Sequence, residues 1–140
     1  MSTETFTPLP EMIGARATEA PEKIALIQDA RKLTYRDLDK AMDRVAEALQ
    51  REGVKPRESV AICAGTSIEY ACAFLGALRA GVAVAPIAPS STAESIVEMV
   101  ADCGAKVFFL DGNVGNELGE RLGTVKAKLV GLDDSAPGVR

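Results

Sequence analysis

The sequence predicts an α/β fold with Rossmann-like layers, in which a parallel sheet is flanked by helices on both faces and preceded by a helix and a β-hairpin. Between residues 60 and 132, short apolar runs alternate with segments of helical periodicity. The apolar runs are nearly continuous, as expected for strands buried on both faces of a parallel sheet. Right-handed helical crossovers join such strands and cover both sides of the sheet.

The first elements predicted are a short helix and a hairpin. Pro10 suits an early helical position, and Pro21 ends the helix soon after Ala20. Two β-rich runs follow, at residues 23–27 and 32–35, and the four residues "QDAR" between them make a hairpin the natural connection.

The clearest helix covers residues 34–53. Thr34 and Asp37 have the spacing of a capping box, and Gly53 supplies a left-handed stop. Apolar residues recur at helical spacing and predict one buried face. These residues are Leu38, Met42, Val45, Ala46 and Leu49.

The next unit is a buried strand, "SVAIC", followed by a helix that ends at Gly81. Thr66 and Glu69 are predicted to form its capping box. Residues 68–80 are apolar nearly all round, so this helix needs neighbours on more than one side. Where such neighbours are missing, we expect exposed apolar faces and self-association.

Further strands and helices complete the alternation. Ser91 and Glu94 predict the start of the third capped helix, and Gly104 predicts its end. In order, the remaining elements are a strand at 82–86, a helix at 90–104, a strand at 106–110, a weaker helix at 116–123, a strand at 127–132 and a loop tail at 133–140.

Composition excludes several classes of function. The 140 residues are 47% hydrophobic, enough for one domain with a core, and the net charge is −4 with acids and bases interspersed. The sequence has no basic stripe, so nucleic-acid binding is not expected. The N-terminus does not have the pattern of a secretory signal. The longest apolar region is interrupted by Arg79, Gly81 and Pro86, so no membrane span is expected.

Histidine is absent, which removes Ser-His-Asp and Cys-His catalysis and the usual zinc sites from these residues. The three cysteines, Cys63, Cys72 and Cys103, form no CxxC pair and lie in apolar patterns. They are interpreted as reduced core residues of a cytoplasmic protein, and no metal site is expected.

Three loops are expected at the carboxyl edge of the sheet, where α/β proteins bind ligands: residues 64–67, 86–91 and 111–116. Each leads into a helix start, which favours an anion. None matches a phosphate loop or a dinucleotide fingerprint. Because Pro86 and Pro89 donate no N–H group, the middle loop suits a rigid wall better than a phosphate cradle.

No pair of catalytic carboxylates emerges. Asp37, Glu69 and Glu94 are explained by helix starts, and Asp111 by a turn, as are Asp133 and Asp134. From motif chemistry alone, the sequence predicts an α/β domain without an assigned activity.

Several segments considered together indicate a family. In order, they are "PEKIALI", "LTYRDLD", "LQREGVKPRESVAI", "EYACAFLGALRAGVAVAPIAPSSTAE" and "DCGAKVFFLD". From about residue 14 to 111, their order and spacing resemble the N-terminal part of the adenylate-forming enzymes, which include acyl-CoA and aryl-CoA synthetases and the adenylation domains of peptide synthetases. Two loop positions depart from this family: Arg57-Glu58, where Gly-Asp is usual, and Ala64-Gly65, where Pro-Asn is frequent.

The resemblance implies a ligase that uses ATP, Mg and a carboxylic acid to form an acyl-adenylate, which then passes its acyl group to CoA. The family's catalytic motifs lie downstream of the matched region. The chain is therefore expected to be a partial domain of a larger fold, inactive alone and partnered by the remainder of the ligase. Within it, residues 1–35 form the helix and hairpin, residues 36–132 the alternating α/β part and residues 133–140 the tail.

The resemblance also suggests one contact residue set. By position, Ala88, Pro89 and Ser90 would run beside the nucleotide end of CoA, although a plain strand-to-helix connector is the simpler interpretation. Two alternatives to the CoA ligase stay open: a peptide-synthetase adenylation domain that serves a carrier protein, and a non-catalytic α/β binding module.

Overall fold

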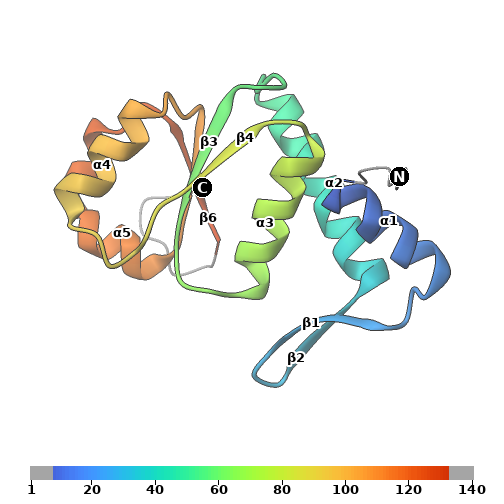
Figure 1. The fold of residues 1–140 in the computed structure, drawn as a ribbon. Helices are drawn as coiled ribbons and strands as arrows, with labels where there is room; N and C mark the ends of the chain where they lie inside the picture. The colour runs from blue at the N-terminus through green and yellow to red at the C-terminus, as the bar shows by residue number, and fades with distance from the viewer. Residues whose placement is uncertain (1–7, 133–140) are drawn as a thin grey trace, which may run out of the picture.

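The computed structural model describes residues 8–132 and confirms the predicted fold class. A parallel sheet with the strand order β4-β3-β5-β6 forms the centre of the molecule, and helices lie on both of its faces (Figure 1). In this register Ala61 of β3 lies between Ala85 of β4 and Phe108 of β5. The strands are β3 (Ser59–Cys63), β4 (Ala83–Pro86), β5 (Val107–Leu110) and β6 (Lys128–Gly131).

The antiparallel hairpin is a separate two-stranded sheet at one end of the molecule (Figure 1). It consists of β1 (Ile24–Gln28) and β2 (Arg31–Thr34), so the connection is shorter than the predicted four residues. The helices are α1 (Leu9–Glu19), α2 (Tyr35–Arg51), α3 (Ile68–Arg79), α4 (Ala93–Asp102), α5 (Gly112–Leu118) and the 3₁₀ helix η1 (Gly119–Thr124).

Each face of the sheet has its own apolar core, as its continuous apolar strands require. On one face, Phe108 and Leu110 pack with Ile96 of α4 and Leu118 of α5. On the other, Ile62 and its neighbours in the sheet pack against α3. A third cluster, formed by Ile13, Leu38 and Met42, joins α1 to α2.

Helix α3 has the neighbours that its apolar sequence predicts, because the sheet covers one side and α2 covers another. Gly76 allows the two helices to approach closely. A Cβ atom added there would lie 2.5 Å from the Cβ atom of Val45 on α2. None of the exposed large apolar side chains among residues 8–132 belongs to α3; they are Leu9, Met12, Ile24, Ile27 and Met99.

The predicted helix stops are confirmed, whereas two predicted caps are wrong by one residue. Gly53, Gly81 and Gly104 all have positive φ values after α2, α3 and α4. Thr34 caps α2 as predicted, accepting from the N–H group of Asp37. The other two caps are Ser67 rather than Thr66 and Thr92 rather than Ser91. In both places adjacent hydroxyl residues compete for the cap, and the residue nearest the helix takes it.

The predicted loop at 111–116 is also wrong, because α5 begins directly at Gly112 and η1 continues the helical segment to Thr124. The predicted tail at 133–140, with Asp133 and Asp134, lies outside the described residues. No helix within residues 8–132 has both the length and the apolar character needed to cross a bilayer.

Strand β4 forms one edge of the sheet. Two backbone N–H groups show which residues along this edge point toward β3. The N–H group of Ala83 donates to the carbonyl of Glu58, directly before β3, and that of Ile87 donates to the carbonyl of Ile62 in β3, at 2.8 Å each. Because N–H directions alternate along a strand, the nitrogen of Pro86 points to the open side of β4. Proline is compatible with this position because no strand among the described residues pairs with β4 there.

Candidate functional site

The loops after β3, β4 and β5 meet at the carboxyl edge of the sheet, as the sequence predicts for a parallel arrangement. One contact ties two of them together. The backbone N–H group of Gly65, after β3, donates to the Oδ2 atom of Asp111, after β5, at 2.9 Å. The carboxylate of Asp111 therefore links the loops that follow the two central strands, β3 and β5.

Asp111 has a second role at this edge. Its Oδ1 atom accepts a hydrogen bond from the N–H group of Val114 at 3.0 Å, so Asp111 is the N-cap of α5 rather than the turn residue that the sequence predicted. Both carboxylate oxygens are thus engaged by backbone donors. The thiol of Cys63 has a pKa raised to about 11, mainly by burial and further by the charge of Asp111.

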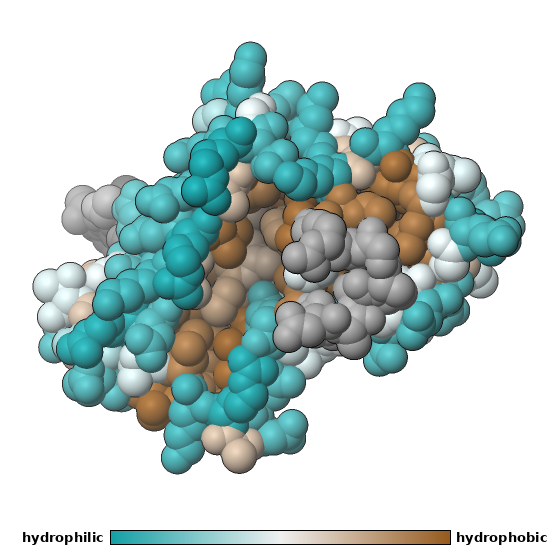
Figure 2. Space-filling model, turned by 180° about the vertical axis from the view of Figure 1, so that it is seen from behind, coloured by the Kyte–Doolittle hydropathy of each residue, from teal (hydrophilic) through white to brown (hydrophobic). Residues whose placement is uncertain are grey.

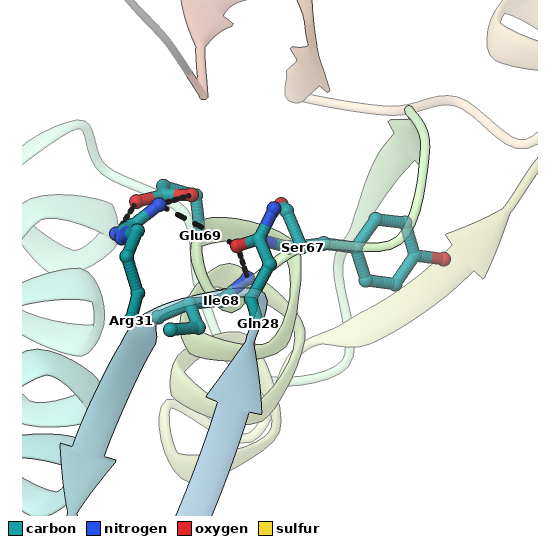
Figure 3. Close-up of polar contacts among 6 residues, drawn as sticks. Gln28, Arg31, Ser67, Ile68 and Glu69 are labelled. Atoms are coloured by element: carbon teal, nitrogen blue, oxygen red, sulfur yellow. Dashed lines mark hydrogen bonds and ion pairs between the residues drawn. The ribbon is translucent and has the colours of Figure 1, made fainter.

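The start of α3 reaches the same edge, and two of its backbone donors, those of Ile68 and Tyr70, are engaged within the chain (Figure 3). The N–H group of Ile68 donates to the Oε1 atom of Gln28 at 2.9 Å, so a hairpin residue caps this helix from outside. The Oγ atom of Ser67 accepts from the N–H group of Tyr70 at 3.0 Å. This helix start therefore offers a ligand little of the anion-binding capacity predicted from its position.

An ion pair reinforces the joint between the hairpin and α3. Arg31 of β2 makes a two-pronged contact with the carboxylate of Glu69, shown by the dashed lines in Figure 3. The hydrogen bond from Arg31 lowers the pKa of Glu69, and the pKa of Arg31 is raised by the same bond. The hairpin is thereby fixed against the N-terminus of α3.

Ala88, Pro89 and Ser90 lie in the loop between β4 and α4, and all three are exposed. The N–H group of Ser91 donates to the carbonyl of Ala88 at 3.0 Å, which makes residues 88–91 a turn with Pro89 at its second position. Proline favours this position because its φ angle is already restricted. The turn leaves residues 88–90 facing outward.

The loops at 64–67 and 86–91 contain no lysine or arginine for phosphates. Within the described part of the chain, no group of three acidic, cysteine or histidine residues could hold a metal ion. Asp111 already accepts two backbone hydrogen bonds. These contacts form a frame that holds the loops at the edge of the sheet in place.

Two residues of this frame could not be found from sequence. Gln28 and Arg31 contact α3 across 40 and 38 positions of the chain. Neither forms part of a local capping pattern, so only the packed fold brings them to this helix.

Comparisons with known proteins agree with the segment pattern. The family model for AMP-binding enzymes matches residues 13–137. The phosphinothricin tripeptide synthetase PhsB from Streptomyces viridochromogenes is 38% identical over 101 residues, covering 71% of this chain and 8% of that protein. Tyrocidine synthase 3 from Brevibacillus parabrevis is 30% identical over 128 residues, covering 91% of this chain and 2% of that protein. The chain thus spans only a small fraction of these two relatives.

Solved structures show the same architecture. A benzoate CoA ligase from Burkholderia xenovorans LB400 superposes with a TM-score of 0.84 and 25% identity, over 94% of this chain and 27% of that one. The NpsA N-terminal subdomain from Klebsiella oxytoca gives a TM-score of 0.68 and 27% identity, over 75% and 28% of the two chains. The chain thus spans about a quarter of each of these solved chains.

Proposed function

The chain belongs to the AMP-binding enzyme family, and from this membership we propose that it forms the N-terminal part of an ATP-dependent ligase. The whole ligase activates a carboxylic acid as an acyl-adenylate and releases pyrophosphate. The observation that carries this proposal is the superposition on a benzoate CoA ligase, which extends over 94% of this chain at a TM-score of 0.84.

The chemistry of the described residues assigns them a framing role in this enzyme. Donors at the α3 start and both oxygens of Asp111 are used internally, so they hold loops in place. ATP and Mg would be bound by the other residues of the ligase. Accordingly, residues 1–140 alone are expected to be inactive.

We propose CoA as the acceptor of the acyl group, so that the whole enzyme is an AMP-forming acid–CoA ligase acting on an acyl or aryl acid. The likeness to a CoA ligase supports this choice. In such an enzyme Ala88, Pro89 and Ser90 form a wall beside the nucleotide end of CoA. Their exposure and the rigid turn that holds them are compatible with that role.

A second candidate is an adenylation domain that passes its acyl group to a carrier protein. It is favoured by sequence identity, which is 38% to a tripeptide synthetase but 25% to the CoA ligase.

In either case the three free cysteines are compatible with the reducing cytoplasm, where we place the enzyme.

The test compares residues 1–140 with the product of the complete reading frame. Acid-dependent exchange of labelled pyrophosphate into ATP is expected from the longer protein and not from residues 1–140. Exchange catalysed by residues 1–140 alone would overturn the framing role, and its absence from the longer protein with every acid tried would overturn the ligase assignment.

The acceptor is tested on the same longer protein. Thioester formation is measured with CoA and with a phosphopantetheinylated carrier protein. A Ser90→Asp variant should raise the KM for CoA, because a carboxylate would stand beside the CoA phosphates, while pyrophosphate exchange stays unchanged. An unchanged KM would remove Ser90 from the CoA site, and transfer to the carrier alone would favour the second candidate.

A further inference from the structure

The loop between β3 and α3 is held at both ends by residues that are distant in the chain. At its start, the N–H group of Gly65 donates to the Oδ2 atom of Asp111 at 2.9 Å, across 46 positions. At its end, the N–H group of Ile68 donates to the Oε1 atom of Gln28 at 2.9 Å, across 40 positions (Figure 3). Asp111 belongs to the start of α5 and Gln28 to the hairpin. Two separate parts of the fold therefore fix residues 64–67.

Thr66 is the exposed side chain of this loop. Ala64 is 5% exposed, and Ser67 caps α3 by accepting from the N–H group of Tyr70 at 3.0 Å. Gly65 has no side chain. Thr66 takes no part in the cap, and its hydroxyl group forms no hydrogen bond within residues 8–132. The fixed backbone therefore displays a polar group that has no internal role of its own.

The residues that follow the loop are packed against other elements. Ile68 and Glu69 line an apolar hollow between α2, α3 and the sheet, which Figure 2 shows bordered by hydrophilic ridges. Ile68 is 6% exposed, and Glu69 is bound by Arg31 of the hairpin. The first turn of α3 is thus fixed, and Thr66 keeps its position at the carboxyl edge of the sheet.

The loop after β4 lies beside this loop at the same edge. The register of the two strands aligns Pro86 with Ile62, so residues 64–67 and residues 88–91 leave the sheet side by side. Neither loop contains lysine or arginine. A ligand segment over Thr66 therefore meets neutral groups rather than the cations that phosphates prefer, and an uncharged segment fits this position.

We propose that Thr66 contacts the pantetheine arm of the acyl acceptor. This inference rests on the proposed function, in which Ala88, Pro89 and Ser90 stand beside the nucleotide end of CoA. Strand β4 is the edge of the sheet and β3 is the next strand inward, so an arm that extends from that nucleotide toward the centre of the sheet crosses the loop of Thr66. A phosphopantetheinylated carrier protein bears the same arm, so the inference applies to either acceptor.

The pantetheine arm has the chemistry that this position accommodates. It is uncharged and contains amide groups, and a hydroxyl group can donate to an amide carbonyl or accept from an amide N–H. Because the loop is fixed before the acceptor binds, the hydrogen bond requires little further ordering of the chain. Asp111 and Gln28 do not touch the arm; they are positioning residues that act through Thr66.

The test uses the complete reading-frame product and removes the hydroxyl group of Thr66. Thr66→Val has nearly the same shape and should raise the KM for CoA and for free pantetheine by about three- to tenfold, the loss expected for one neutral hydrogen bond. Acid-dependent pyrophosphate exchange should stay unchanged, because it precedes transfer to the acceptor. Thr66→Ser keeps the hydroxyl group and should behave like the parent. With a phosphopantetheinylated carrier protein as the acceptor, the same rise is expected in its KM.

Three results would overturn the inference. An unchanged KM in Thr66→Val would show that the hydroxyl group is not used. A rise with CoA but none with pantetheine would assign Thr66 to the nucleotide instead of the arm. A Thr66→Ser variant as impaired as Thr66→Val would show that the methyl group, and not the hydroxyl group, makes the contact.

Thr18→Val is the matched control. Thr18 is exposed on α1, where its hydroxyl group donates to the carbonyl of Gly14 at 3.2 Å, and it lies outside the loops of the carboxyl edge. This variant should leave both KM values and pyrophosphate exchange unchanged. Circular dichroism and urea denaturation check the fold of all variants. An equal rise in KM in Thr18→Val would contradict a specific contact at Thr66.

The positioning role is tested with a double-mutant cycle. Gln28→Ala frees one end of the loop and should raise the KM for pantetheine by about twofold or more in the parent. It should have no further effect in Thr66→Val, because it acts through the missing hydroxyl group. A purely structural loss would appear alike in both backgrounds, so strictly additive effects would reject the positioning role.

The outcome is separable from that of the proposed function. Pyrophosphate exchange with an unchanged KM in Thr66→Val would retain the ligase and reject the contact. If the parent shows no exchange, calorimetric titration with CoA and pantetheine compares the parent with Thr66→Val. Weaker binding by the variant would then retain the contact and reject the activity, whereas equal binding, or none, would reject both.

Discussion

Asp111 and Gly65 are joined across the carboxyl edge of the sheet, where the N–H group of Gly65 donates to the Oδ2 atom of Asp111 at 2.9 Å. The same carboxylate caps α5 through its Oδ1 atom. One side chain therefore fixes the loop after β3 relative to the helix after β5. Because Oδ2 binds Gly65 and Oδ1 caps α5, substitutions can separate the contributions of these two hydrogen bonds to the free energy of unfolding.

Asp111→Asn keeps one acceptor for the cap but places an NH₂ group opposite the N–H of Gly65. We expect it to lower the free energy of unfolding by about 1 kcal/mol, and Asp111→Ala, which loses both contacts, by about 2 kcal/mol. Urea denaturation measures both. Asp102→Asn, at an exposed helix end, is the control. Equal losses for Asn and Ala would show that the cap contributes nothing, and an Asn variant as stable as the parent would show that the bond to Gly65 contributes nothing.

Gly76→Ala should destabilise the chain by about 1–3 kcal/mol, because its Cβ atom would overlap Val45 and approach the carbonyl of Met42 at 3.0 Å. In Gly14→Ala, also within a helix, the nearest atoms lie at 3.7 Å, so it should stabilise by about 0.5–1 kcal/mol. Chemical denaturation of the Gly76→Ala/Val45→Ala double variant should recover part of the loss. Strict additivity would contradict the overlap.

Arg79 joins three helices. It donates to Asp43 at 2.9 Å and to the carbonyls of Asp39 and Pro10 at 3.0 and 2.9 Å, and it also pairs with the Asp39 carboxylate. Its side chain is only 19% exposed.

Arg79→Met should therefore cost about 2 kcal/mol in unfolding free energy, since half-buried acceptors lose their donor. Arg36→Met removes an ion pair with Glu22 in which both side chains are at least 50% exposed, and it should cost under about 1 kcal/mol. Thermal unfolding compares the two variants. Similar effects would show that the network at Arg79 is no stronger than a surface pair.

Arg57 adopts a φ of 74°, a left-handed conformation that is strained for a side chain with a Cβ atom. This is the position where the family resemblance leads one to expect glycine. Arg57→Gly should raise the free energy of unfolding by about 1 kcal/mol, because the strain is removed. Asp29, at φ 55°, tolerates the region better, so Asp29→Gly should have less effect in the same urea titration. A destabilised Arg57→Gly variant would contradict this interpretation.

The pair of Arg31 with Glu69 predicts a pH dependence. Because the pKa of Glu69 is lowered in the folded chain, its contribution is present above the ordinary carboxyl pKa and is lost as pH falls through the lowered value. Glu69→Gln should reduce the Tm at neutral pH by a few degrees at most, and the difference should vanish in acid. Glu98→Gln, an exposed carboxyl, is the control. A difference that persists at low pH would exclude the ion pair as its cause.

Local sequence signals predicted most of the framework. The apolar runs around Ile62 and Phe108 predicted the buried strands, and glycines such as Gly53 and Gly104 predicted the helix ends, because only their left-handed backbone stops a helix cheaply. These features depend on neighbours within a few positions, and the structure confirms them.

Signals that depend on distant contacts were not accessible. The cap of α3 is Ser67 rather than its neighbour Thr66, and Gln28 contacts Ile68 across 40 positions of the chain. The contact of Asp111 with Gly65 spans 46 positions and has no local signal, whereas its cap to Val114 is local and was missed because the helix was expected to begin later. The candidate site is assembled from such contacts. The sequence therefore predicted which edge of the sheet carries the site, but not the hydrogen bonds that hold its loops together.

The orientation of Pro86 has a consequence for how this sheet can grow. A fifth strand laid against β4 would find no N–H group at the proline, so edge-to-edge aggregation and strand addition are disfavoured there. Strand β6 at the opposite edge contains no proline. Any enlargement of the sheet by strand addition is therefore expected at the β6 edge and not at the β4 edge.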